Sequence, residues 1–161
     1  MTGYDALAEV YEWLISDAKL TPAEFAAAFD DAIGLLPPNA HVLDSSCGTG
    51  QLAVGLAGLG MQVVASDASA AMVRRTEKLA EELAASLRTV RAGWHELPDH
   101  FDDASFDMVF CVGNSLHHAE GASGRLAAGV DVTPTASWRT LGSHLPDLGT
   151  RARWRLPAGH P

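Results

Sequence analysis

A short apolar run that leads directly into a glycine-rich turn is the feature that most restricts how this chain can fold. Residues 41–44, His-Val-Leu-Asp, predict a strand, and residues 45–50, Ser-Ser-Cys-Gly-Thr-Gly, predict a tight turn. Apolar residues then recur at helical spacing, at Leu52, Ala53, Leu56, Ala57 and Leu59. Glycines in such a turn let a ligand approach main-chain atoms closely, and the next helix presents free N–H groups. Because strand, turn and helix follow in this order, a ligand-binding loop is favoured. The alternative is a turn that only joins the strand to the helix.

Strand and helix patterns continue to alternate after this turn. Strands are predicted at 62–66, 88–91 and 106–112, and Ser69 is a predicted N-cap for the helix between the first two of these. This alternation predicts an α/β fold with a parallel, doubly wound sheet. In such a sheet the ligand lies beyond the carboxyl ends of the strands.

Two helices are predicted ahead of the first strand. Apolar residues at helical spacing between Tyr4 and Ile15 predict the first helix. The second begins at Thr21-Pro22-Ala23-Glu24, which has the residue types of a capping box, and its apolar face continues to Leu36.

Two carboxylates are expected at the ligand edge of the sheet, Asp44 after the first strand and Asp67 after the second. Asp67 could accept hydrogen bonds from both hydroxyls of a ribose, and capping of the next helix is its alternative role. Residues 48–53 also fit the dinucleotide pattern G-x-G-x-x-A, but a pyrophosphate beside Asp44 would cost about 4 kcal/mol for like charges about 4 Å apart. S-adenosylmethionine has a ribose, an ammonium and a sulfonium and no phosphate, and suits the acidic pair better. An NAD-dependent oxidoreductase is the less favoured alternative.

Four motifs in order then carry a family resemblance. They are Val-Leu-Asp-x-x-Cys-Gly-Thr-Gly at 42–50, Ser-Asp-Ala-Ser-x-x-Met at 66–72, Phe-Asp-Asp-Ala-Ser-Phe-Asp at 101–107 and Cys-Val-Gly-Asn-Ser at 111–115. Together they resemble the class I S-adenosylmethionine-dependent methyltransferases, and the last motif is most similar to the glycine N-methyltransferase branch. The resemblance covers about residues 4–124. It implies a Rossmann-like fold, here expected to be incomplete after the fourth strand, with S-adenosyl-L-methionine as cofactor and a small-molecule acceptor, such as an amine or amino acid.

The same resemblance implies roles for individual residues. Asp44 would face the methionine end of the cofactor, and Asp67 would bind the ribose. The other implied cofactor contacts are Ser46, Gly48, Gly50, Ala68, Met72, Trp94 and Val112. Asn114 and His117 would lie toward the acceptor. No catalytic residue is predicted, because in-line methyl transfer from a sulfonium chiefly requires positioning.

The adenine end carries the most open alternatives. Ala68, Met72 and Trp94 would pack near the base, although plain core packing is an alternative for Met72 and Trp94. An Asn-Trp pair of the branch reads Gly93-Trp94 here, so the lost amide hydrogen bond would have to come from the backbone. Tyr11 or Trp13 could fold over the cofactor as a lid, with ordinary helix packing as the alternative.

Composition and charge argue against some classes of binding partner. The formal net charge of −9 lacks the basic footprint of a nucleic-acid-binding protein. No run of 18 apolar residues and no secretory signal is present, so no membrane contact is predicted and a cytoplasmic location is expected. Cys47 and Cys111 cannot build a disulfide framework, and with His117 and His118 they lack metal-ligand spacing, so no metal site is expected.

The sequence changes character near Arg125. Residues 1–124 hold six Lys+Arg and eighteen Asp+Glu, whereas residues 125–161 hold five Arg, no Lys and two Asp. Apolar periodicity also stops there, and no fifth strand is evident. We therefore predict a cofactor-binding portion at 1–124 and an aberrant or disordered tail at 125–161, for which a shifted reading frame in GC-rich DNA is one hypothesis. An inactive cofactor-binding fragment is accordingly the alternative to an active enzyme.

Overall fold

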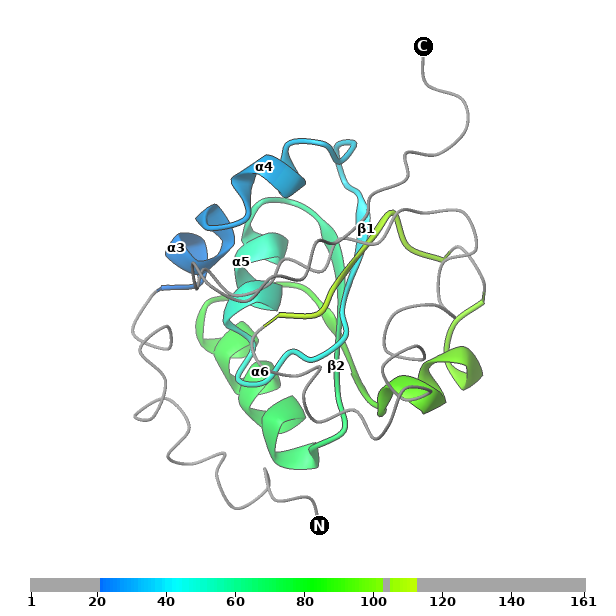
Figure 1. The fold of residues 1–161 in the computed structure, drawn as a ribbon. Helices are drawn as coiled ribbons and strands as arrows, with labels where there is room; N and C mark the ends of the chain where they lie inside the picture. Colours follow the sequence, from blue (N-terminus) through cyan, green and yellow to red (C-terminus); the bar gives the residue numbers. More distant parts are fainter. Residues whose placement is uncertain (1–20, 103–104, 113–161) are drawn as a thin grey trace, which may run out of the picture.

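The computed structural model describes residues 21–102 and 105–112 (Figure 1). Its four strands form one parallel sheet in the order β3-β2-β1-β4, and they are β1 (His41–Asp44), β2 (Gln62–Asp67), β3 (Arg88–Arg91) and β4 (Met108–Phe110). Because β1 pairs with both β2 and β4, the direction of winding reverses at β1. The predicted doubly wound parallel sheet is confirmed.

The strand boundaries follow the sequence closely except at β4. This strand is assigned only from Met108 to Phe110, whereas the apolar run predicted 106–112. Asp107 precedes β4 and bonds to β1 through its main chain and its side chain. Its N–H donates to the His41 carbonyl at 2.8 Å, and its carboxylate accepts from the His41 N–H at 2.8 Å. The side chain of Asp107 thus replaces a main-chain acceptor where the ladder begins.

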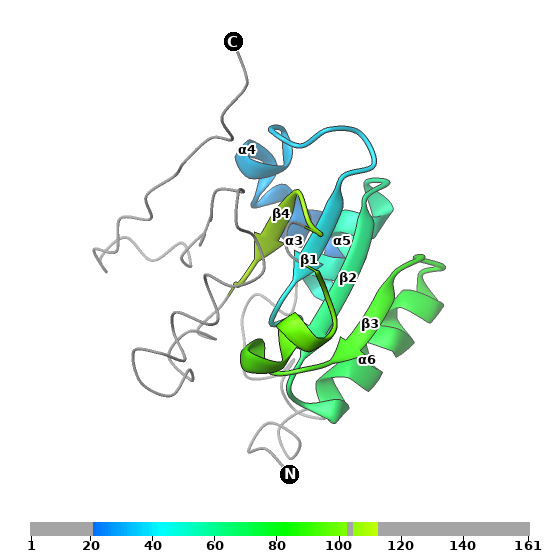
Figure 2. The same cartoon turned by 90° about the vertical axis from the view of Figure 1, so that its right-hand side faces the viewer.

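Helices α5 (Gln51–Gly58) and α6 (Ala70–Glu82) connect successive strands and lie on one side of the sheet (Figures 1 and 2). Ser69 caps α6, since its hydroxyl accepts from the Met72 N–H at 3.3 Å, as predicted. Gly60 follows the end of α5 with a φ of +86°, a conformation that glycine adopts without steric cost.

The prediction of one continuous helix from Thr21 to Leu36 is wrong, although the predicted start of the helix is confirmed. Thr21 and Glu24 form the capping box of α3 (Pro22–Ala27), and a second short helix, α4 (Asp30–Ile33), follows after a break. The break at Phe29 accompanies a contact made across the fold, because the ring of Phe29 meets Phe110 of β4 edge-on at 5.8 Å between centroids. Packing against the sheet overrides the local helical period here.

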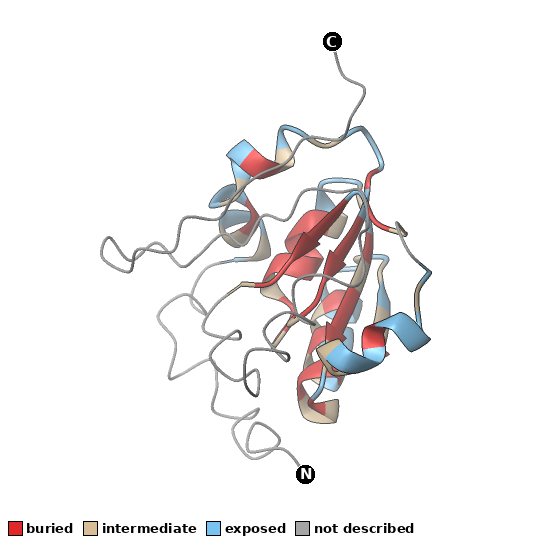
Figure 3. Ribbon diagram, turned by 45° about the vertical axis from the view of Figure 1, so that its right-hand side comes forward, coloured by how far each residue is buried: buried red, intermediate tan, exposed pale blue. Residues whose placement is uncertain are grey.

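The core has two parts, one on each face of the sheet (Figure 3). Val42 of β1 packs with α3 and α5 on one face. Leu43 faces the other way, toward Leu97 in the 3-10 helix η2 (Trp94–Asp99). Because β1 is covered on both faces, the residue that ends it, Asp44, is carried into a buried position.

Several predicted features lie outside the described residues. They are the lid candidates Tyr11 and Trp13, the acceptor-side residues Asn114 and His117, and the tail at 125–161. Within the described ranges, no helix has the length and apolar character needed to cross a membrane.

Candidate functional site

The carboxyl ends of β1 and β2 and the turn before α5 form the candidate site. Asp67 joins them: one carboxylate oxygen accepts from the Gly48 N–H at 3.0 Å, and the other accepts from the Ser69 N–H at 2.8 Å. The sequence left ribose binding and helix capping as alternatives for Asp67. The second bond joins Asp67 to Ser69, the N-cap residue of α6, and the first shows that Asp67 also holds the glycine turn.

The glycine turn itself rests on α6. Gly48 and Gly50 have φ values of +54° and +91°, so both occupy the left-handed region that favours glycine. The Thr76 hydroxyl donates to the Gly48 carbonyl at 3.1 Å, and a Cβ added to Gly50 would lie 2.8 Å from Thr76 side-chain atoms. In the helix predicted after Ser69, Thr76 lies at helical spacing with apolar residues such as Met72 and Leu79, which predicted only a packing role for it. Its hydroxyl, the polar group in that stripe, was the available sign of a contact.

Asp44 is the most unusual group at this edge. It has 0% exposure, one oxygen accepts from the Ser46 N–H at 3.4 Å, and the other oxygen has no hydrogen-bond partner among the residues that the structure describes. The pKa of Asp44 is raised from 3.8 to about 7: burial is the main cause, the Ser46 bond opposes it, and the charge of Asp67 adds to it. A buried carboxylate with no cation beside it in the described part of the chain fits a ligand that brings positive charge.

Trp94 approaches the same edge from the opposite face of the sheet. Its Nε1–H donates to the Ser45 carbonyl at 2.9 Å, and its half-buried ring packs beside the cluster that contains Leu43. The neighbouring backbone donor is already engaged, because the Gly93 N–H donates to the Glu96 carboxylate at 2.7 Å. The backbone bond expected at position 93 would therefore have to displace Glu96.

The remaining predicted contacts differ in accessibility. Met72 is 1% exposed, so the core-packing alternative describes its state here, and contact with a base stays a prediction. Ala68 is exposed, and Ser46 and Val112 are half-buried. The Ser46 hydroxyl donates to the Cys111 sulfur at 3.8 Å.

The two cysteines have buried, free thiols. Burial raises the pKa of both the Cys47 and the Cys111 thiol, so both are protonated near neutral pH. This state agrees with packing roles and not with nucleophilic ones. Across the part of the chain that the structure describes, no three His, Cys, Asp or Glu side chains gather as a metal site would require.

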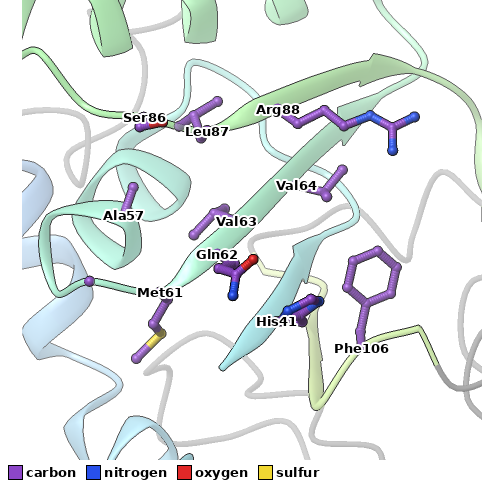
Figure 4. A pocket seen from close by; sticks show the side chains of 11 residues that line it. His41, Ala57, Met61, Gln62, Val63, Val64, Ser86, Leu87, Arg88 and Phe106 are labelled. Atoms are coloured by element: carbon purple, nitrogen blue, oxygen red, sulfur yellow. The ribbon is translucent and has the colours of Figure 1, made fainter. Parts of the chain in front are cut away.

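A shallow groove lies at the other end of the strands. His41, Gln62 and Arg88, which begin β1, β2 and β3, line it together with Phe106 (Figure 4). Doubly wound sheets bind their ligands at the carboxyl ends, so this groove is not part of the candidate site.

Comparisons with known proteins agree with this geometry. A family model described as "Methyltransferase domain" matches residues 42–130. A glycine/sarcosine N-methyltransferase of Aphanothece halophytica is 35% identical over 78 residues, which cover 48% of this chain and 29% of that protein. This chain therefore spans less than a third of that curated relative.

Two solved structures share the fold. The TehB-like SAM-dependent methyltransferase of Corynebacterium glutamicum has a TM-score of 0.55 at 24% identity, over 76% of this chain and 63% of that one. The CcbJ methyltransferase of Streptomyces caelestis has a TM-score of 0.60 at 23% identity, over 82% of this chain and 53% of that one. At these identities the likeness concerns the fold alone.

Proposed function

The chain belongs to the class I S-adenosylmethionine-dependent methyltransferases, and from this premise we propose that it binds S-adenosyl-L-methionine at the carboxyl edge of its sheet and transfers the methyl group to a small molecule. One observation carries the proposal: Asp44 is fully buried, one of its oxygens has no partner within residues 21–102 and 105–112, and it lies where the winding of the sheet reverses. The ammonium of the cofactor is a cation of the size and chemistry that such a carboxylate would bind.

The other residues of the edge have complementary roles in this proposal. Asp67 fixes the Gly48 turn and would bind the ribose, while Gly48 and Gly50 keep the backbone open to the ligand. Trp94 would flank the adenine from the face opposite α6. When bound, the cofactor supplies a methyl group activated on sulfur, and the chain contributes orientation and the exclusion of water.

Two features of the site argue against binding of a dinucleotide. A pyrophosphate would lie against the Asp44 carboxylate, and like charges at a buried site repel strongly. In addition, the Gly48 N–H, a donor that a phosphate would use, already donates to Asp67. The glycine turn therefore already binds a negative charge, the Asp67 carboxylate, in place of a phosphate.

We further propose that the methyl acceptor is an amine or an amino acid. The support is the name of the matched relative, a glycine/sarcosine N-methyltransferase, together with the Cys-Val-Gly-Asn-Ser motif at 111–115. Asn114 and His117 would lie on the acceptor side.

A second candidate is binding of the cofactor without turnover. The family match ends at residue 130, close to the compositional change near Arg125. A tail at 125–161 that is unrelated to the family would leave the acceptor side unformed while the cofactor edge persists.

Titration calorimetry on the full chain tests binding. S-adenosylhomocysteine is expected to bind and NAD is not. Asp44→Asn should weaken binding by at least about tenfold, since hydrogen bonds to charged groups contribute about 1.5–3 kcal/mol. Asp31→Asn, which changes an exposed carboxylate on α4, is the matched control. Binding of NAD without any response to S-adenosylhomocysteine would refute the proposal, and methyl transfer to glycine or sarcosine separates the enzyme from the binding module.

A further inference from the structure

We propose that Thr76 is a positioning residue for the glycine turn, and that its hydroxyl sets which main-chain groups the turn offers to the cofactor. The proposal rests on the proposed function, because it concerns the same edge of the sheet. Thr76 has 0% exposure, so it would act through the turn and not by touching the ligand.

The turn is held at Gly48 from two directions. The Gly48 N–H donates to Asp67 at the end of β2, at 3.0 Å. The Gly48 carbonyl accepts from the Thr76 hydroxyl on α6, at 3.1 Å. Figure 1 shows the turn after β1 passing beside α6. With both its N–H and its carbonyl bound, Gly48 has one orientation relative to the sheet.

This orientation determines where the next main-chain donor points. No peptide bond among the described residues is cis, and in a trans peptide the carbonyl and the following N–H point in opposite directions. The Gly48 carbonyl points to Thr76, so the Thr49 N–H points away from α6. No described group accepts from this N–H, although Thr49 is 6% exposed. A main-chain donor that no described group binds, on a residue with this little exposure, suits an acceptor atom on a ligand.

The packing beneath the turn supports the same role. A Cβ on Gly50 would lie 2.8 Å from both Thr76 Oγ1 and Cγ2, so the turn and α6 are in close contact. The Cys47 sulfur lies 3.4 Å from the same hydroxyl. Without the hydroxyl, the described side-chain donor left to the Gly48 carbonyl would be the Cys47 thiol, a weak donor at 4.0 Å, and the peptide could rotate its oxygen toward the ligand.

Three variants separate the hydroxyl from the bulk of the side chain. Thr76→Val keeps the shape and removes the donor, and Thr76→Ser keeps the donor and removes a methyl group. Thr89→Val is the matched control, because the Thr89 hydroxyl bonds Glu77 of the same helix at 2.7 Å, away from the turn. If Thr76→Val does not fold, Thr76→Ala against Thr76→Ser makes the same comparison.

The first readout is the affinity for S-adenosylhomocysteine, measured by calorimetry on the full chain. Thr76→Val, or Thr76→Ala in its place, should weaken binding by about tenfold, the usual effect of one buried hydrogen bond, whereas Thr76→Ser and Thr89→Val stay within about threefold of the wild type. If the valine and serine variants weaken binding equally, side-chain volume explains the effect and the proposal is wrong.

The second readout needs no ligand. Amide hydrogen exchange at Gly48 and Gly50 should accelerate about tenfold in Thr76→Val, while amides of β1 keep their protection. Unchanged exchange at both glycines would overturn the proposal. If the wild type does not bind S-adenosylhomocysteine, the proposed function fails, and exchange still decides whether the hydroxyl restrains the turn.

Discussion

Replacing Asp44 by asparagine is expected to stabilise the ligand-free fold at alkaline pH, even though the residue is central to the site. Burial raises the pKa of Asp44 from 3.8 to about 7. An acid whose pKa is higher in the folded state takes up a proton on folding between those values. Its stabilising contribution is present below pH 3.8 and is lost as the pH rises through 7. The shift corresponds to about 4 kcal/mol at alkaline pH, at 1.36 kcal/mol per pKa unit.

Urea unfolding between about pH 5 and pH 8.5 measures this effect. The free energy of unfolding of the wild type should fall relative to Asp44→Asn across the range, because the amide has no proton to lose. Other shifted groups act outside this window: hydrogen bonds lower the pKa of Glu24 and Glu96 below 4.5, and the pKa of the Cys47 thiol lies well above 9.0. Asp31→Asn should follow the wild type. A difference between Asp44→Asn and wild type that is the same at both ends of the range would refute the reasoning.

Four further predictions concern the site and the tail. Binding of S-adenosylhomocysteine should weaken about tenfold between pH 8 and pH 6 as Asp44 takes up a proton, and calorimetry should find no such change in Asp44→Asn. Gly50→Ala should lower the free energy of unfolding by at least about 2 kcal/mol in urea titrations, since φ is +91° and Thr76 fills the space. Trp94→Phe should cost about 1 kcal/mol by the same measurement, through the lost bond to Ser45. The gene downstream of codon 125 should contain, in another frame, an apolar strand pattern, and a stop codon there would exclude the frameshift.

Local patterns predicted most of this fold because its strands and helix starts are encoded by adjacent residues. Residues 41–44 and 88–91 are strands as predicted, and the caps at Thr21 and Ser69 form the expected bonds. The break at Phe29 could not be predicted in this way. It accompanies a ring contact with Phe110, a residue far away in the sequence. The spacing of apolar residues within a helix carries no information about such a distant partner.

The sequence predicted that Asp44, Asp67 and the glycine turn lie at one edge of the sheet, but not what each residue bonds. The engagement of the Gly93 N–H by Glu96 was accessible from sequence, since a glutamate three residues after a helix start is half of a capping box. The bond from Thr76 to Gly48 was not, because it depends on how closely α6 approaches the turn. Asp67 illustrates the limit: two roles were open, and its bond to the N-cap residue Ser69 coexists with a bond to the turn that neither role included.

The two carboxylates at this edge differ in how many hydrogen bonds they accept, and this difference affects which ligand the site can bind. Asp67 receives main-chain N–H groups on both oxygens and fixes the turn. Asp44 receives one long bond and keeps a buried oxygen to which no described group donates, so its ionised form is destabilised until a cation arrives. A glycine turn by itself accommodates phosphates and nucleosides alike, whereas the desolvated charge next to it discriminates between them. It follows that a cationic ligand should stabilise the fold more at pH 8 than at pH 6, because only the ionised carboxylate gains from its arrival.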